Sequence, residues 1–178
     1  MQKQLTRKQA TLLRELNDLA EVLGMDYQSI QEYEPEARTA KLQVMKRDMI
    51  RGQIIVWYTL IDEALNINIC HIYFGKNRKF NQLWRTKRFT AFNHHILENM
   101  YPLQKLHLVC EFQNVPKSIC DAIRDLNTVR NGLAHNFFFE NAKRAKLTWK
   151  GENIMNPVGV KLFVEDMNKI HSYFFKTA

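Results

Sequence analysis

The sequence has little glycine, proline or cysteine. Its 178 residues contain 6 glycines, 4 prolines and 3 cysteines. All-β sandwiches and barrels use many glycines and prolines in their turns, and so this composition disfavours that class. Disorder and a collagen-like structure are excluded on the same grounds. The cysteines, Cys70, Cys110 and Cys120, are odd in number and lack a CxxC spacing. They predict neither a disulfide framework nor a zinc site, and they favour a reducing cytoplasm.

The sequence also lacks a long uninterrupted apolar run. Its most apolar stretch, residues 54–74, contains Asp62 and Glu63 and is therefore a poor membrane span. Residues 1–23 interleave charged and apolar side chains, and this pattern is not that of a signal peptide. We therefore expect a cytoplasmic protein that does not insert into membranes.

Acidic residues are scarce relative to basic ones. Lys and Arg total 26 against 18 for Asp and Glu, so the formal net charge is +8, and the isoelectric point is near 9.5. This charge points to a polyanionic partner, either nucleic acid or an anionic membrane surface, although a merely basic protein is an alternative.

What is present is helical periodicity in a chain long enough for one domain. We predict an all-α, up-and-down bundle of five or six helices forming a single domain over 1–178, with an N-terminal helix and linker in 1–35 and the core bundle in 36–178. A long helix should end at Gly75, with a bend or break near Arg51-Gly52, and a basic loop should follow to Arg88. Further helices are expected over 89–100, 102–112, 116–137 and 156–175, with a short β-hairpin near 146–155.

The helix predicted over 116–137 carries an apolar stripe and, on another face, a polar row. The stripe consists of Ile119, Ile123, Leu126, Val129 and Leu133; the row consists of Asn127, Asn131 and His135 at i, i+4 and i+8. Asn, Thr and Gly are poor residues for a helix interior, yet four of them stand at 127, 128, 131 and 132. Such a sacrifice of helix propensity indicates a functional site.

The string Arg130-Asn131-Gly132-Leu133-Ala134-His135 resembles the signature of the HEPN superfamily (higher eukaryotes and prokaryotes nucleotide-binding domains). That signature is an Arg, usually followed by a polar residue, with a His about five positions on at the end of a bundle helix. The resemblance covers about residues 37–175. It implies a helical bundle, homodimerisation, and metal-independent RNA cleavage at the dimer interface.

The chemistry of RNA cleavage accounts for the residue types in this string. The 2′-hydroxyl is the nucleophile, so the reaction needs a proton acceptor, a proton donor for the leaving oxygen, and a cation for the charged phosphorane. His135 can serve either proton role near neutrality, Arg130 can bind phosphate oxygens, and Asn131 can orient either group. Two-fold symmetry would bring a second His135 to the same cleft. The alternative is that Arg130 and His135 are merely capping or surface residues.

The long helix carries an acidic residue in its apolar seam. The seam is Ile55, Tyr58, Asp62, Leu65, Ile69 and Ile72, and Asp62 stands where an apolar residue is expected. By resemblance to HEPN proteins, Asp62 or Glu63 would orient Arg130 or His135; otherwise both are solvated or paired locally. Some HEPN toxins carry a modifiable Tyr two residues after the His, but this chain has Phe137 there.

Basic residues in two segments are candidates for RNA binding, namely Arg85, Lys87 and Arg88 in the first and Lys143, Arg144 and Lys146 in the second. Solvated loops are the alternative. His94 and Glu98 share a helix face, but a metal site would need further ligands, so we expect no metal. Glycine-rich phosphate loops are absent, and no cofactor is expected.

These features together predict a metal-independent endoribonuclease of the HEPN type, a toxin or phage-defence effector that acts as a homodimer on RNA, with an antitoxin protein as a conceivable partner. The alternative is a catalytically inactive HEPN-like module that binds nucleotide, nucleic acid or a protein. A helical scaffold in which the string is incidental is the third reading.

Overall fold

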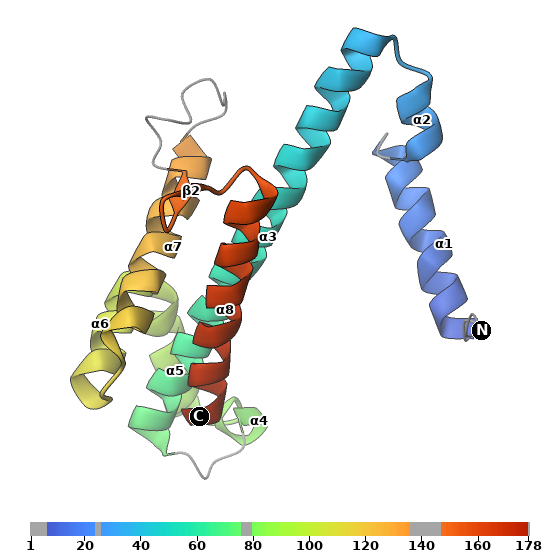
Figure 1. Ribbon diagram of the computed structural model, residues 1–178. Coiled ribbons are helices and arrows are strands. Elements are labelled where there is room, and N and C mark those ends of the chain that lie inside the picture. Colours follow the sequence, from blue (N-terminus) through green and yellow to red (C-terminus); the bar gives the residue numbers. More distant parts are fainter. Residues whose placement is uncertain (1–6, 24–25, 76–79, 136–146, 178) are drawn as a thin grey trace, which may run out of the picture. The chain divides into compact units, whose positions relative to one another are not determined.

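The computed structural model describes residues 7–23, 26–75, 80–135 and 147–177 (Figure 1). The chain divides into two compact units, Met1–Met49 and Ile50–Ala178. Within the described ranges the chain is helical apart from one two-stranded hairpin, which confirms the all-α class. The assignment of residues 1–178 to a single domain, divided at 35/36, stays a prediction.

The first unit contains α1 (Arg7–Val22), α2 (Tyr27–Gln31) and the beginning of α3 (Pro35–Phe74). Asp26 caps α2, because its carboxylate accepts a hydrogen bond of 2.8 Å from the Ser29 N–H. Arg38 of α3 donates to the carbonyl of Gln31 at 2.7 Å and to that of Tyr33 at 3.1 Å, which ties α3 to the end of α2.

The helix α3 spans 40 residues. It continues unbroken through Arg51 and Gly52, where the sequence predicted a bend or a break. It ends where predicted, because Gly75 adopts a φ of +84°, a conformation that favours glycine, and donates its N–H to the His71 carbonyl. Its buried residues within the second unit recur at helical spacing and include Ile54, Ile61, Leu65 and Ile69.

The second unit continues with short elements and three longer helices. They are α4 (Phe80–Leu83), α5 (Lys87–His95), the 3-10 helix η1 (Leu97–Asn99), α6 (Pro102–Phe112), α7 (Lys117–His135) and α8 (Pro157–Thr177). The basic segment before Arg88 is therefore not entirely a loop, since α4 interrupts it. Thr86 accepts a hydrogen bond from the Phe89 N–H, and this cap starts α5 two residues before the predicted position.

The core of the second unit surrounds the C-terminal half of α3. Lys105 of α6, Asn127 of α7 and His171 of α8 all contact side chains of this helix half. The predicted apolar stripe of α7 is confirmed at its four buried members, Ile123, Leu126, Val129 and Leu133, whereas Ile119 is half-buried. In the polar row of α7, Asn127 and Asn131 are less buried than the buried members of this stripe, and Asn127 contacts Tyr58 of α3.

The predicted hairpin consists of β1 (Thr148–Trp149) and β2 (Glu152–Asn153), joined by Lys150 and Gly151 with φ values of +50° and +84°. It is anchored to α8 by Asp166, which accepts bonds from the Trp149 indole at 3.0 Å and from the Lys150 ammonium at 2.6 Å. Burial raises the pKa of Asp166, but the bonds from Lys150 and Trp149 outweigh it and hold the pKa below its usual value. This network therefore stabilises the fold at neutral pH and loses its effect as the pH falls through the folded-state pKa.

The contact between α8 and the hairpin gives a first prediction. A Cβ at Gly159 would lie 2.2 Å from the Asn153 carbonyl oxygen and 2.9 Å from the Ile154 Cα, and both are backbone atoms. We expect Gly159→Ala to lower the free energy of unfolding by about 1–3 kcal/mol, because the hairpin must shift. Urea denaturation followed by circular dichroism measures this.

The matched control is Gly52→Ala in the interior of α3, where an added Cβ meets no atom within 4 Å. This variant should gain roughly 0.5–1 kcal/mol from the higher helix propensity of alanine. Equal effects of the two substitutions would contradict the described packing of α8 on the hairpin.

Candidate functional site

Arg130 lies on the exposed face of α7 and reaches back over α3. Its Cζ atom lies 5.2 Å from the centroid of the Tyr58 ring, a cation–π contact. Its Nη1 atom also donates a hydrogen bond of 3.1 Å to the Oδ1 of the neighbouring Asn131. The first two residues of the predicted catalytic set are therefore in direct contact, and an aromatic ring supports the guanidinium.

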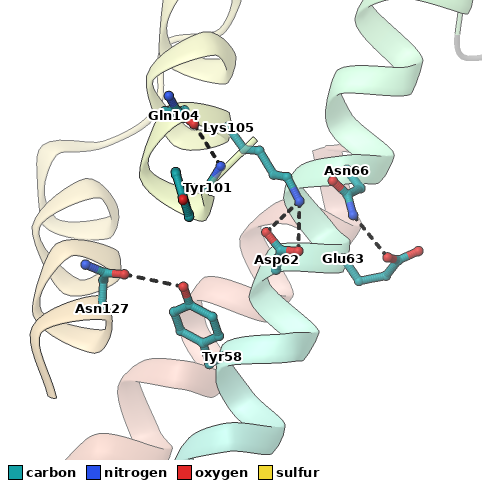
Figure 2. A network of polar contacts seen from close by, with 8 residues as sticks. All are labelled: Tyr58, Asp62, Glu63, Asn66, Tyr101, Gln104, Lys105 and Asn127. Atoms are coloured by element: carbon teal, nitrogen blue, oxygen red, sulfur yellow. Dashed lines mark hydrogen bonds and ion pairs between the residues drawn. The ribbon is translucent and has the colours of Figure 1, made fainter. Parts of the chain in front are cut away.

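Tyr58 links α3 to the polar row of α7. Its hydroxyl donates to the Oδ1 of Asn127 over 3.4 Å, as Figure 2 shows. Burial raises the pKa of Tyr58 above its usual value; the charge of Arg130 lowers it and that of Asp62 raises it. The phenol is therefore protonated at neutral pH and acts as a donor. The sequence identified Tyr58 only as a member of the apolar seam; the clue to its role was its position one turn before Asp62.

Asp62 forms an ion pair with a lysine of α6 rather than with Arg130. Its two carboxylate oxygens accept from the Lys105 ammonium of α6 at 2.9 and 2.8 Å (Figure 2). Lys105 is only 4% exposed, so its ammonium is largely withdrawn from water, whereas Asp62 is partly accessible. Glu63 is exposed and accepts a bond of 3.3 Å from Asn66 instead. None of the interactions of the described residues joins Asp62 or Glu63 to Arg130, and an orienting role toward His135 stays a prediction because that side chain lies outside the described part of the structure.

The reason for this pairing is the position of α6. A lysine that is buried against α3 must find a counter-charge, because an unpaired ammonium in a core is costly. Asp62 is the carboxylate within its reach. Lys105 lies 43 residues away in the sequence, and so no local pattern indicated it.

A pocket of about 450 Å³ opens beside Arg130, between α3 and α7. We call it the Arg51–Arg130 pocket; its lining includes Arg51, Ile54, Tyr58, Thr59, Arg130 and Leu133. No acidic side chain lines it among the described residues. The pocket combines positive charge on both walls with an apolar floor. Arg51 is a site residue that sequence analysis missed, because it appeared only as part of a suspected helix break.

His135 is the last residue of α7, one turn after Asn131. The backbone thus places both residues on one face of the helix. The side chain of His135 lies outside the described part of the structure, as do Lys143, Arg144 and Lys146 of the second basic segment.

The three basic residues of the first segment have two different environments. Arg85 and Lys87 line a shallow depression with His94 and His95. Arg88 instead places its guanidinium 5.7 Å from the centroid of the Phe74 ring. His94 contacts Glu98 at 3.1 Å, although the two residues belong to α5 and η1 rather than to one helix as predicted. The described residues contain no group of three or more His, Cys, Asp or Glu side chains that could hold a metal ion.

The three cysteines are free. Burial raises the pKa of Cys70 to about 11, and burial and the neighbouring Cys120 raise that of Cys110 to about 11. Both thiols are therefore protonated at neutral pH and are poor nucleophiles.

No family model matches this chain, and neither the curated proteins nor the solved structures that were compared with it gave a match. No helix in the described ranges combines the length and the apolar character needed to cross a membrane.

The Asp62–Lys105 pair gives a second prediction. Asp62→Ala should cost roughly 2–4 kcal/mol of unfolding free energy, because it leaves a buried ammonium without a counter-charge. The cost falls below that of a fully buried pair, since the Asp62 side chain is 27% exposed.

The double variant Asp62→Leu with Lys105→Met should recover most of the loss, because it removes both charges and keeps apolar volume. A double-mutant cycle by urea denaturation measures the coupling. Additive effects of the two substitutions would show that the pair does not contribute as a unit.

Proposed function

We propose that this chain is a metal-independent endoribonuclease of the HEPN type, acting as a homodimer in the manner of a toxin or phage-defence effector. The observation that carries the proposal is the placement of Arg130. Arg130 lines a pocket that no described acidic residue lines, and its guanidinium forms no ion pair with a carboxylate among the described residues. An arginine held in this way is available to a phosphate.

In this proposal each residue of the string has a separate task. His135 takes the proton from the 2′-hydroxyl, and a second His135 from the other subunit donates a proton to the leaving 5′-oxygen. Arg130 stabilises the negative charge of the phosphorane, and a fixed cation is worth most where it needs no reorganisation. Asn131 holds the Arg130 guanidinium, while the Tyr58 ring limits its motion from below.

The second candidate is a HEPN-like module that binds nucleotide, nucleic acid or a protein without cleaving RNA. The Arg51–Arg130 pocket favours it, because a cationic pocket can bind an anion whether or not a proton donor stands nearby. The two candidates differ in whether RNA is cut, and this is directly measurable.

Catalysis gives the third prediction. Purified protein should cleave total RNA in the presence of EDTA and leave 2′,3′-cyclic phosphate ends, because the nucleophile belongs to the RNA. His135→Ala should slow cleavage by roughly two to four orders of magnitude. Arg130→Ala should slow it by about two to three orders.

Arg124→Ala is the matched control, since Arg124 lies on α7, is exposed, and pairs with Asp121 away from the pocket. This variant should cleave RNA at the wild-type rate. Circular dichroism should show all three variants folded, because Arg124 and Arg130 are exposed and His135 belongs to the polar row of α7 rather than to its apolar stripe. If His135→Ala or Arg130→Ala cleaves as fast as the wild type, the assignment is wrong. RNA with a 2′-deoxy group at the cleaved position should not be cut, because it lacks the 2′-hydroxyl nucleophile.

Assembly gives the fourth prediction. The protein should sediment at equilibrium as a dimer at micromolar concentration, because the reaction has two proton transfers and each chain supplies one His135. Wild-type and His135→Ala chains mixed in equal amounts, with full subunit exchange, test the shared site. If cleavage needs both histidines, activity should fall to about one quarter of the all-wild-type value, the fraction of dimers with two wild-type chains.

A fall to only about one half would mean that each subunit acts alone, and a monomer that cleaves RNA would exclude the composite site.

A further inference from the structure

We propose that the Arg51–Arg130 pocket binds one nucleotide of the RNA, with phosphate at the two guanidinium groups and the base against Ile54 and the Tyr58 ring. This inference rests on the proposed function, because it names the ligand of the same site. It goes further in assigning Arg51, Tyr58 and Thr59 to substrate recognition.

The charge of the pocket selects a phosphate. Arg51 comes from α3 and Arg130 from α7, so the two cations belong to opposite walls. Arginine presents a planar set of N–H donors that matches phosphate oxygens. The carboxylate that follows Tyr58 by one turn, Asp62, is bound by Lys105 and so does not compete for either guanidinium.

The remainder of the pocket suits a base and a ribose. Ile54 is 1% exposed and Leu133 is 8% exposed, so together they form an apolar floor. Tyr58 adds an aromatic ring, on which a nucleic-acid base can pack. The Thr59 hydroxyl already donates to the Ile55 carbonyl at 3.0 Å, which leaves its oxygen to accept from a ribose hydroxyl or a base amino group.

The size of the pocket agrees with a ligand of this kind. Its volume of about 450 Å³ lies within the range of roughly 300–1,000 Å³ that is typical of small-molecule sites. A bare inorganic anion would leave the apolar floor unused, and a purely apolar ligand would leave the positive charge of the pocket walls unmatched. A nucleotide matches both the charged walls and the apolar floor of the pocket. Because Arg130 also belongs to the catalytic string, the bound nucleotide would adjoin the phosphate that is cleaved.

The test is calorimetric titration with adenosine 3′,5′-bisphosphate and uridine 3′,5′-bisphosphate, which mimic one RNA nucleotide with both of its phosphates. The wild-type protein should bind at least one of them, and adenosine, uridine or inorganic phosphate alone should bind at least about tenfold more weakly. Arg51→Gln should weaken binding by about tenfold or more, whereas Arg124→Gln, with an arginine outside the pocket, should bind like the wild type.

A second variant covers the case in which Arg51→Gln fails to fold. Thr59 is exposed at the rim, so Thr59→Phe should fold normally and abolish binding by filling the pocket. Binding that survives Thr59→Phe, or inorganic phosphate that binds as tightly as the bisphosphates, overturns the proposal.

Failure of this inference can be separated from failure of the proposed function. If the wild type cleaves RNA but Arg51→Gln binds the bisphosphates unchanged, the proposed nuclease activity stands and the proposed nucleotide site is wrong. If bisphosphate binding depends on Arg51 but the wild type does not cleave RNA, the proposed nucleotide site stands and the proposed nuclease activity is wrong. Bisphosphates that bind but do not displace a 2′-methoxy RNA oligonucleotide would overturn the assignment to RNA.

Discussion

The ion pair between Lys105 and Asp62 joins α6 to the C-terminal half of α3, and in our account it sets the electrostatics of the neighbouring site. Lys105 is almost completely buried, and burial of a charge is tolerated only with a partner in good geometry. The pair also satisfies a carboxylate one helical turn from Tyr58. Without Lys105, Asp62 would be an unpaired anion near Tyr58, whose ring lies beneath Arg130, and would attract that guanidinium.

The consequence is a separation of charges along α3. The acidic position is neutralised on the side of α6, and the side of α7 keeps two arginines around a pocket with an apolar floor. Tyr58 lies between these regions: its hydroxyl holds Asn127 and its ring supports Arg130. In the account proposed here, this arrangement presents a preorganised cation to an RNA phosphate, which is the condition for electrostatic stabilisation of a charged transition state.

Features that depend on local periodicity and turn chemistry could be predicted from the sequence. The apolar stripe of α7, the end of α3 at Gly75 and the hairpin around Lys150-Gly151 follow from helical spacing and from backbone conformations that glycine permits. Features that depend on pairing between distant segments could not. The partner of Asp62 lies on α6. Arg51 and Arg130 line one pocket only because α3 packs against α7. The role of His135 and of Lys143, Arg144 and Lys146 stays a prediction from the sequence.

The most direct test of the central claim is nuclear magnetic resonance of the arginine side chains during titration with a 2′-methoxy RNA oligonucleotide, which cannot be cleaved because its 2′-hydroxyl is blocked. If Arg130 holds a phosphate, its Nε–Hε signal should shift on addition of the RNA, and the signal of Arg124 on the same helix should stay in place. Assignment comes from the Arg130→Lys and Arg124→Lys variants. An Arg130 signal that does not move while the oligonucleotide binds would contradict the account.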